Sequence, residues 1–353
     1  MFYFGPDALW HFWRYTPLDC HKPYFLTLSE NERIGVEHRP DLRWFFLGQK
    51  RQTNSLGFCD RPRTREELAG NPTLAVMGES FVESAGLPPE ATFGGRLERY
   101  LSQSREINVL DMSVTNTVLE SQIELLKEKV IRAYRPRWVL VAFLAYGNMN
   151  EKVAARDIWR RRIETAPDFW PLWKRSFALY ILNDYWSHID WNREWLMAKL
   201  AKWTGGSSKN TAPKPFQTRG EALRKPAADG QDRSRGDFSK AEFLLRELKE
   251  LGKKHGFEVI LSPLSHLKEL NNPARDRFER SELETIARKL DLPYIDTYPF
   301  LDGEDPRVCI LWAANRHPNE YGYDLMTKGL ARALIDRGLL SAKDPSAEKP
   351  ATV

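Results

Sequence analysis

Cysteine is scarce in this chain of 353 residues, and its three cysteines, Cys20, Cys59 and Cys309, form no CxxC pair. Such a sparse, odd set predicts neither a disulfide framework nor a zinc site. We expect no metal and no other cofactor. No apolar run reaches the roughly 18 residues that a membrane helix needs. The N-terminal stretch also lacks the basic and apolar regions of a secretory signal.

Charge of one sign is not concentrated anywhere in the sequence. The net charge is +5, and charged residues make up 29% of the chain, but no segment forms a basic block. This distribution argues against nucleic acid as a partner. On these absences we expect a cytoplasmic protein. A periplasmic or membrane-associated location is the alternative if the natural protein carries an anchor ahead of Met1.

Short apolar segments alternate with amphipathic ones along most of the chain. This alternation favours a three-layer α/β/α sandwich with a parallel five-stranded sheet. We assign residues 71–150 and 238–340 to this domain. The expected strands lie at 72–78, 106–113, 137–148, 257–264 and 292–299, and the expected helices at 91–103, 118–133, 240–256, 280–290 and 321–338.

The remaining segments differ from this pattern. Residues 1–70 show no sustained period and are expected to be irregular structure packed on the core. Residues 151–203 hold seven of the twelve tryptophans and show helical spacing. Residues 204–237 are rich in Gly, Ser, Pro and charge, which is typical of a flexible loop, and residues 341–353 resemble a disordered tail.

Polar residues follow the expected strands at the edge where an open parallel sheet binds its ligands. "LAVMGESFVES" places Gly78, Glu79 and Ser80 after the first strand, and "NRHPNEYG" places His317 before the last helix. A serine in such a turn is more often a helix cap than a nucleophile. A hydroxyl, a base and nearby amide donors are nevertheless the parts that nucleophilic acyl transfer needs. The order of the set therefore favours a nucleophilic Ser80.

The same motifs resemble the SGNH (GDSL-type) hydrolases. The resemblance lies in Gly-acid-Ser after the first strand, Asn after the third in "YGNMN", and His-Pro-Asn before the last helix. "TNSLGF" at 53–58 also resembles a stretch that precedes the nucleophile strand in bacterial members. The resemblance implies a flavodoxin-like fold. It further implies a serine esterase or deacylase acting on an O-acyl group, such as O-acetyl, of a carbohydrate or small polar substrate.

The resemblance also implies roles for individual residues. Ser80 matches the nucleophile, its backbone N–H the first oxyanion donor, and His317 the base. Asn148 matches the asparagine whose amide is an oxyanion donor, with Asn150 as the fallback if the turn is one step longer. Ser113 stands where the family has a glycine whose backbone N–H is the second donor.

Three departures from the family pattern leave alternatives open. Met149 stands where the family commonly has an aspartate after the asparagine of the third strand. Glu79 replaces the family's aspartate beside the nucleophile, and it either reaches a substrate partner or holds the turn together. The acid expected two or three residues before the histidine is absent, because Ala314 and Asn315 stand there. Either Asn315 or a backbone carbonyl then holds His317 in a dyad, or the protein is catalytically degenerate and binds a glycan or protein partner. An O-acetyltransferase built from the same parts is a third alternative.

The tryptophan-rich insertion leaves the sheet directly after the asparagines of the third strand. We therefore expect 151–203 to form a helical cap or one wall of the serine pocket. The simpler interpretation is a pair of helices packed on the domain. Trp and Lys on one amphipathic helix also suit contact with a membrane surface or a protein.

Overall fold

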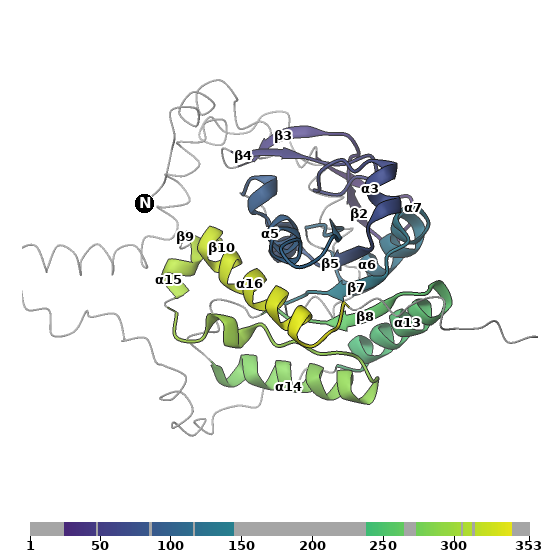
Figure 1. Ribbon diagram of the computed structural model, residues 1–353. Coiled ribbons are helices and arrows are strands. Elements are labelled where there is room, and N and C mark those ends of the chain that lie inside the picture. Colours follow the sequence, from purple (N-terminus) through teal and green to yellow (C-terminus); the bar gives the residue numbers. More distant parts are fainter. Residues whose placement is uncertain are drawn as a thin grey trace, which may run out of the picture.

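The core of the molecule is a parallel sheet of four strands. The computed structural model describes residues 25–46, 49–84, 87–115, 117–144, 238–264, 273–304, 306–312 and 315–340. The strands are β5 (Thr73–Met77), β6 (Asn108–Asp111), β7 (Trp138–Val141) and β8 (Glu258–Leu261), and their order across the sheet is β6-β5-β7-β8 (Figure 1). All neighbouring strands run parallel.

Helices cover both faces of this sheet, so the three-layer α/β/α fold is confirmed (Figure 1). Alternate residues of β5 point to opposite layers: Leu74 and Val76 to one, Ala75 and Met77 to the other. Burial of both faces explains why the strand is an unbroken apolar run. The first layer holds α5 (Phe93–Leu101) and α16 (Glu320–Asp336). The second holds α6 (Leu119–Leu125), a π-helical turn (Leu126–Val130), α7 (Ile131–Tyr134), α13 (Ser239–His255) and α14 (Pro273–Lys289).

The expected fifth strand is reduced to a single bridge, so the prediction of five strands is corrected to four among the described residues. Tyr294 bridges Leu261 of β8 in parallel, and the Ile295 N–H donates to the Leu261 carbonyl at 2.9 Å. Pro293 has no N–H for the ladder. A 3₁₀ turn (Tyr298–Leu301) begins soon afterwards. The segment therefore extends the sheet by only a few hydrogen bonds.

The expectation of irregular structure is wrong for the described part of residues 1–70. Two antiparallel hairpins and one helix occur there: β1 (Leu26–Leu28) with β2 (Val36–His38), β3 (Arg43–Phe46) with β4 (Gln49–Gln52), and α3 (Arg65–Gly70). Leu26, Ile34 and Val36 are buried in the second layer's core, so the segment does pack on the domain. Strands of three or four residues are too short to show a period in sequence.

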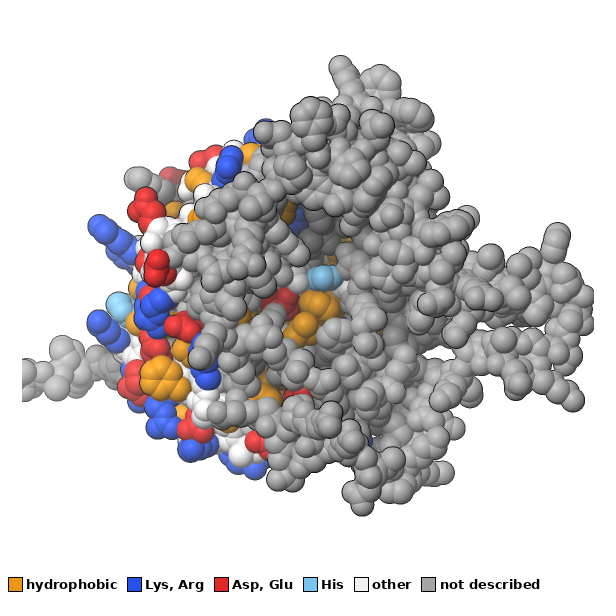
Figure 2. Space-filling model, turned by 180° about the vertical axis from the view of Figure 1, so that it is seen from behind, with side chains coloured by type: hydrophobic (Ala, Val, Ile, Leu, Met, Phe, Trp, Pro, Cys, Tyr) orange, Lys and Arg blue, Asp and Glu red, His pale blue; other side chains and the backbone are white. Residues whose placement is uncertain are grey.

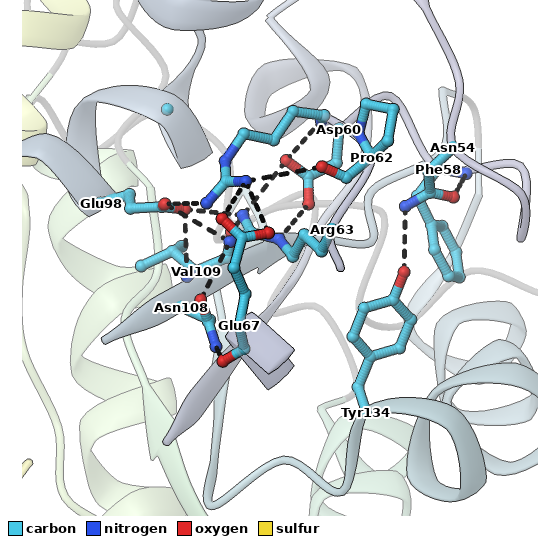
Figure 3. A network of polar contacts seen from close by, with 12 residues as sticks. Asn54, Phe58, Asp60, Pro62, Arg63, Glu67, Glu98, Asn108, Val109 and Tyr134 are labelled. Atoms are coloured by element: carbon cyan, nitrogen blue, oxygen red, sulfur yellow. Dashed lines mark hydrogen bonds and ion pairs between the residues drawn. The ribbon is translucent and has the colours of Figure 1, made fainter. Parts of the chain in front are cut away.

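The "TNSLGF" segment forms a loop that closes on its own asparagine (Figure 3). Asn54 Oδ1 accepts the backbone N–H groups of Leu56 and Phe58, each at 3.0 Å. The Asn54 amide donates to the Tyr134 hydroxyl on α7 at 3.3 Å. Gly57 has φ +86°, and a Cβ there would lie 2.4 Å from the His38 carbonyl oxygen. The motif thus holds the N-terminal segment in place.

A buried ion-pair network continues from this loop (Figure 3). Arg63, whose side chain is 1% exposed, bonds Asp60 at 3.1 Å and Glu98 of α5 at 2.6 Å. The network ties the loop to α5 and to the start of β6, where the Val109 carbonyl also accepts from Arg63. The N-terminal segment is therefore fixed beside the strands that carry the candidate site.

Several predicted segments lie outside the described residues: the insertion at 151–203, the loop at 204–237 and the tail at 341–353. Their predicted roles as cap, contact surface and linker stay predictions. None of the described helices has both the length and the apolar character needed to cross a bilayer. On the face in Figure 2, charged side chains of both signs are interspersed over the described surface.

Candidate active site

The turn after β5 brings Ser80 to the carboxyl edge of the sheet. Ser80 is the first residue of the one-turn helix α4 (Ser80–Glu83), and Glu79 is its N-cap. A Cβ at Gly78 would lie 2.2 Å from Val82 Cγ2 and 2.9 Å from the Ala142 carbonyl oxygen. Only glycine therefore allows β5 to turn so tightly into α4 beside β7. The motif thus forms a tight strand-to-helix turn.

His317 reaches this turn from the other end of the chain. It lies on β10 (Asn315–Pro318), which pairs antiparallel with β9 (Ile310–Trp312) after the short helix α15 (Pro306–Cys309). Asn319 caps the following helix α16 by accepting the Gly322 N–H at 3.0 Å. His317 Nε2 lies 2.8 Å from Ser80 Oγ, which is hydrogen-bonding distance. The structure thus brings together two residues 237 positions apart.

Phe81 packs against the imidazole of His317. The two ring centroids are 4.5 Å apart with an interplanar angle of 33°. Phe81 is itself fixed, because its carbonyl accepts the Tyr323 hydroxyl of α16 at 2.7 Å. The ring of Phe81 therefore restricts the orientation of His317, a contribution that the sequence motif did not indicate.

Glu79 makes a direct contact with the serine. Its Oε2 lies 2.6 Å from Ser80 Oγ, at hydrogen-bonding distance, and accepts the Phe81 N–H at 3.1 Å. Burial, at 2% exposure, raises the pKa of Glu79 to about 7, with a smaller rise from the charge of Glu83; hydrogen bonds from Ser80 and Phe81 act the other way. The carboxyl therefore holds the turn and touches the candidate nucleophile as well.

The expectation for Ser113 needs correction. Its backbone N–H donates to Asp111 Oδ1 at 3.1 Å, its hydroxyl bonds the same oxygen, and the residue is fully buried. An N–H committed to a buried carboxyl is not available to an oxyanion. Through this contact Asp111 shapes the loop that follows β6. Burial raises the pKa of Asp111 to about 7, against the hydrogen bonds from Ser113.

Three other predicted site residues are not tested by the structure. Asn148 and Asn150 lie outside the described residues, as does the side chain of Asn315, whose backbone belongs to β10. Their predicted roles as oxyanion donors and as the partner of His317 stay predictions.

A second cluster of polar groups lies buried at the other end of α4. His38 Nε2 is 3.4 Å from Glu83 Oε2, and Cys59 Sγ is 3.6 Å from His38 Nδ1 and 3.8 Å from Glu83 Oε1. Arg51 donates to the carbonyls of Glu83 and Leu87, each at 2.9 Å, and lies 3.7 Å from Glu83 Oε1. Sequence reasoning missed this cluster, because its members come from four separate segments.

The charges in this cluster compensate one another. Burial acts to lower the pKa of His38, but the charges of Cys59 and Glu83 raise it to about 10. Burial likewise acts to raise the pKa of Glu83, but His38 and Arg51 hold it below its usual range.

His38, Cys59 and Glu83 are residue types that bind zinc, and their ligand atoms lie within 4.8 Å of one another. The sequence predicted no metal constellation, so this grouping was not foreseen. Arg51 and protonated His38 already give the carboxylate two cationic partners. We therefore interpret the cluster as a structural ion-pair network.

Several solved structures are similar to this chain at low sequence identity. No family model and no curated protein matches the chain. Similar solved structures include a putative lipolytic protein of the G-D-S-L family from Desulfitobacterium hafniense DCB-2 (12% identity, TM-score 0.41, 75% of this chain and 100% of that one). TesA is similar at 12% identity and TM-score 0.42 (74% and 98%). Axe2, an acetylxylan esterase from Geobacillus stearothermophilus, is similar at 12% sequence identity and a TM-score of 0.39, over 74% of this chain and 93% of that one.

Proposed function

We propose that this protein is a serine ester hydrolase of the SGNH type, which removes an O-acyl group from a carbohydrate or another small polar substrate. The observation that carries the proposal is the 2.8 Å contact between Ser80 Oγ and His317 Nε2. Both side chains are only half-buried, so a substrate could reach them. A paired hydroxyl and imidazole at the carboxyl edge of a parallel sheet is an arrangement suited to acyl transfer.

In the proposed reaction, Ser80 Oγ attacks the acyl carbon while its proton passes to His317 Nε2. The imidazolium then donates that proton to the departing alcohol oxygen as the ester bond breaks. Water repeats the sequence on the acyl-enzyme, which releases the carboxylic acid and restores Ser80. The Ser80 N–H and the Asn148 amide are the proposed oxyanion donors, and Ser113 is no longer among them.

The test combines a covalent probe with a substrate assay on the full-length protein. A fluorophosphonate should label the wild type and not Ser80→Ala. Hydrolysis of p-nitrophenyl acetate and acetate release from acetylated xylooligosaccharides should fall by about 10⁴- to 10⁶-fold in the same variant. Ser104→Ala, which changes an exposed serine of the loop after α5, is the matched control and should be labelled normally.

Two results would overturn this proposal. If the wild type is not labelled under conditions that label a known serine hydrolase, the site is not a reactive nucleophile, and a binding role takes its place. If Ser80→Ala hydrolyses the esters at the wild-type rate, the chemistry occurs elsewhere. Transfer of acetyl to an added glycan, with no acetate released, would identify an acyltransferase.

A further inference from the structure

Ser80 Oγ has two close polar neighbours but only one proton. Glu79 Oε2 lies 2.6 Å away and His317 Nε2 lies 2.8 Å away. A hydroxyl donates one hydrogen bond, so it cannot donate to the carboxyl and to the imidazole together. The protonation state of Glu79 therefore decides which neighbour receives the serine's proton.

An ionised Glu79 makes the serine unreactive. A carboxylate can only accept, so the Ser80 hydroxyl must donate to Glu79. His317 Nε2 must then carry a proton and donate to Ser80 Oγ. An imidazole that already has a proton on Nε2 cannot take one from the serine, and the nucleophile is not activated.

A protonated Glu79 reverses both hydrogen bonds. The carboxyl O–H donates to Ser80 Oγ, and the Ser80 hydroxyl donates to an unprotonated His317 Nε2. This is the arrangement in which the imidazole can accept the serine proton during attack.

Three features of the structure favour the neutral form of Glu79. Its Oε1 is buried with no hydrogen-bond partner among the described residues, and a charge left partly unpaired in this way is costly. No Lys or Arg among the described residues forms an ion pair with Glu79. Arg51 pairs with Glu83 instead. In the part of the chain that the structure describes, the titratable groups near Glu79 are Glu83 on α4, Tyr323 on α16 and, on the other side of Ser80, His317 on β10. Of these, only His317 could become a cation.

We propose that Glu79 is a catalytic residue that works as a neutral acid, donating a hydrogen bond to Ser80 Oγ, and that ionisation of Glu79 switches the site off. The inference rests on the proposed function. The inference adds a proton-controlled step to the proposed reaction. It also gives a physical role to Glu79, the longer acid that replaces the family's aspartate. The pKa of about 7 for Glu79 places this switch in the physiological range.

The decisive variant is Glu79→Gln, because the amide can donate to Ser80 Oγ at every pH. In the wild type, the rate of Ser80 labelling by a fluorophosphonate should fall about tenfold per pH unit above an apparent pKa near 7, and kcat/KM for p-nitrophenyl acetate should fall with it. In Glu79→Gln this high-pH decline should disappear. The variant should then react faster than the wild type at pH 9.

Asp111→Asn is the matched control. Asp111 is a second buried carboxyl whose pKa lies at about 7, but its hydrogen bonds go to Ser113 and not to Ser80. The high-pH decline should persist in this variant. A decline that disappears in Asp111→Asn and stays in Glu79→Gln would overturn the proposal.

Two further outcomes for Glu79→Gln would also overturn it. A loss of about 10²- to 10⁴-fold at all pH values would show that the carboxylate is the base rather than a donor. An unchanged pH profile would show that Glu79 is only the cap of α4.

A readout that needs no turnover separates this inference from the proposed function. Nitrogen NMR of histidine-labelled protein, with His317→Gln to assign the signal, reports which ring nitrogen carries the proton. Above pH 8, His317 should be protonated on Nε2 in the wild type and on Nδ1 in Glu79→Gln. The same tautomer in both proteins would overturn the inference even if Ser80 is labelled. Absence of labelling at every pH would instead count against the proposed function.

Discussion

The two ends of helix α4 carry buried glutamates with opposite electrostatics. Glu79 precedes the helix and Glu83 ends it, and their exposures are 2% and 3%. Burial raises the pKa of Glu79 to about 7, whereas His38 and Arg51 hold the pKa of Glu83 below its usual range in spite of burial. Burial is common to both, so the presence or absence of buried cations decides the protonation state.

This difference assigns different tasks to the two ends. The Glu83 end is compensated by charge and joined to four other segments, including the one that holds Thr115, whose N–H donates to Glu83 Oε2 at 2.7 Å. It anchors the helix. Among the described residues no Lys or Arg pairs with the Glu79 end, which contacts the serine directly. A fixed anchor therefore lies one turn away from a carboxyl whose charge can change near neutral pH.

The largest effect should come from breaking the anchor. Glu83→Gln leaves Arg51 and His38 buried without their carboxylate, so the free energy of unfolding should fall by about 3–5 kcal/mol in urea titrations at pH 7. Glu120→Gln is the control, because Glu120 pairs with Arg33 and Lys240 near the surface. It should cost no more than about 1 kcal/mol. Equal losses in the two variants would mean that the network does not anchor α4.

The pH dependence of stability should separate the two glutamates next. The native state holds the Glu79 proton up to about pH 7, but the unfolded chain releases it near 4.5, so the stability contributed by Glu79 is lost as pH rises through this window. Glutamine does not titrate, so only the wild type loses this stability. The unfolding free energy of Glu79→Gln minus that of the wild type should therefore increase by up to about 3 kcal/mol from pH 4.5 to pH 8.

Glu83 should give the opposite slope. Its native pKa is lowered, so its stabilisation is present above the ordinary pKa and is lost as pH falls through the native value. The deficit of Glu83→Gln should accordingly be largest near neutral pH and shrink in acid. Urea titrations of the three proteins across pH measure both slopes. For each variant, the unfolding free energy minus that of the wild type is plotted against pH. If the two plots slope in the same direction, the two sites do not differ in charge compensation.

The smallest effect should come from the ring that positions His317. Phe81→Leu keeps the site apolar but removes the aromatic contact with the imidazole, worth about 0.5–1.5 kcal/mol. We expect kcat/KM for p-nitrophenyl acetate to fall about two- to tenfold, mainly through kcat. Phe93→Leu is the control, since Phe93 is fully buried in the same layer, and it should lose stability without this fall. An equal fall in both variants would point to general loosening of the layer.

Local patterns in the sequence predicted much of the sheet and helices. The apolar run before Gly78 and the amphipathic segment before Gly338 became β5 and α16, because local period and turn residues are sufficient for long or fully buried elements. The hairpins of residues 26–52 were missed, and the segment after Leu292 was predicted as a strand when it forms only a bridge. Short elements depend on their neighbours more than on their own sequence.

For the site, the sequence by itself determined which residues stand at the turns: Ser80 behind a glycine after a buried strand, and His317 shortly before the last helix. Covalent order and local conformation are enough for that. Only the tertiary structure decided that Ser80 and His317 touch, that the Ser113 N–H is committed to Asp111, and that the pKa values of Glu79 and Glu83 shift in opposite directions. These outcomes depend on burial and on Coulomb interactions between groups distant along the chain, which no local pattern of residues encodes.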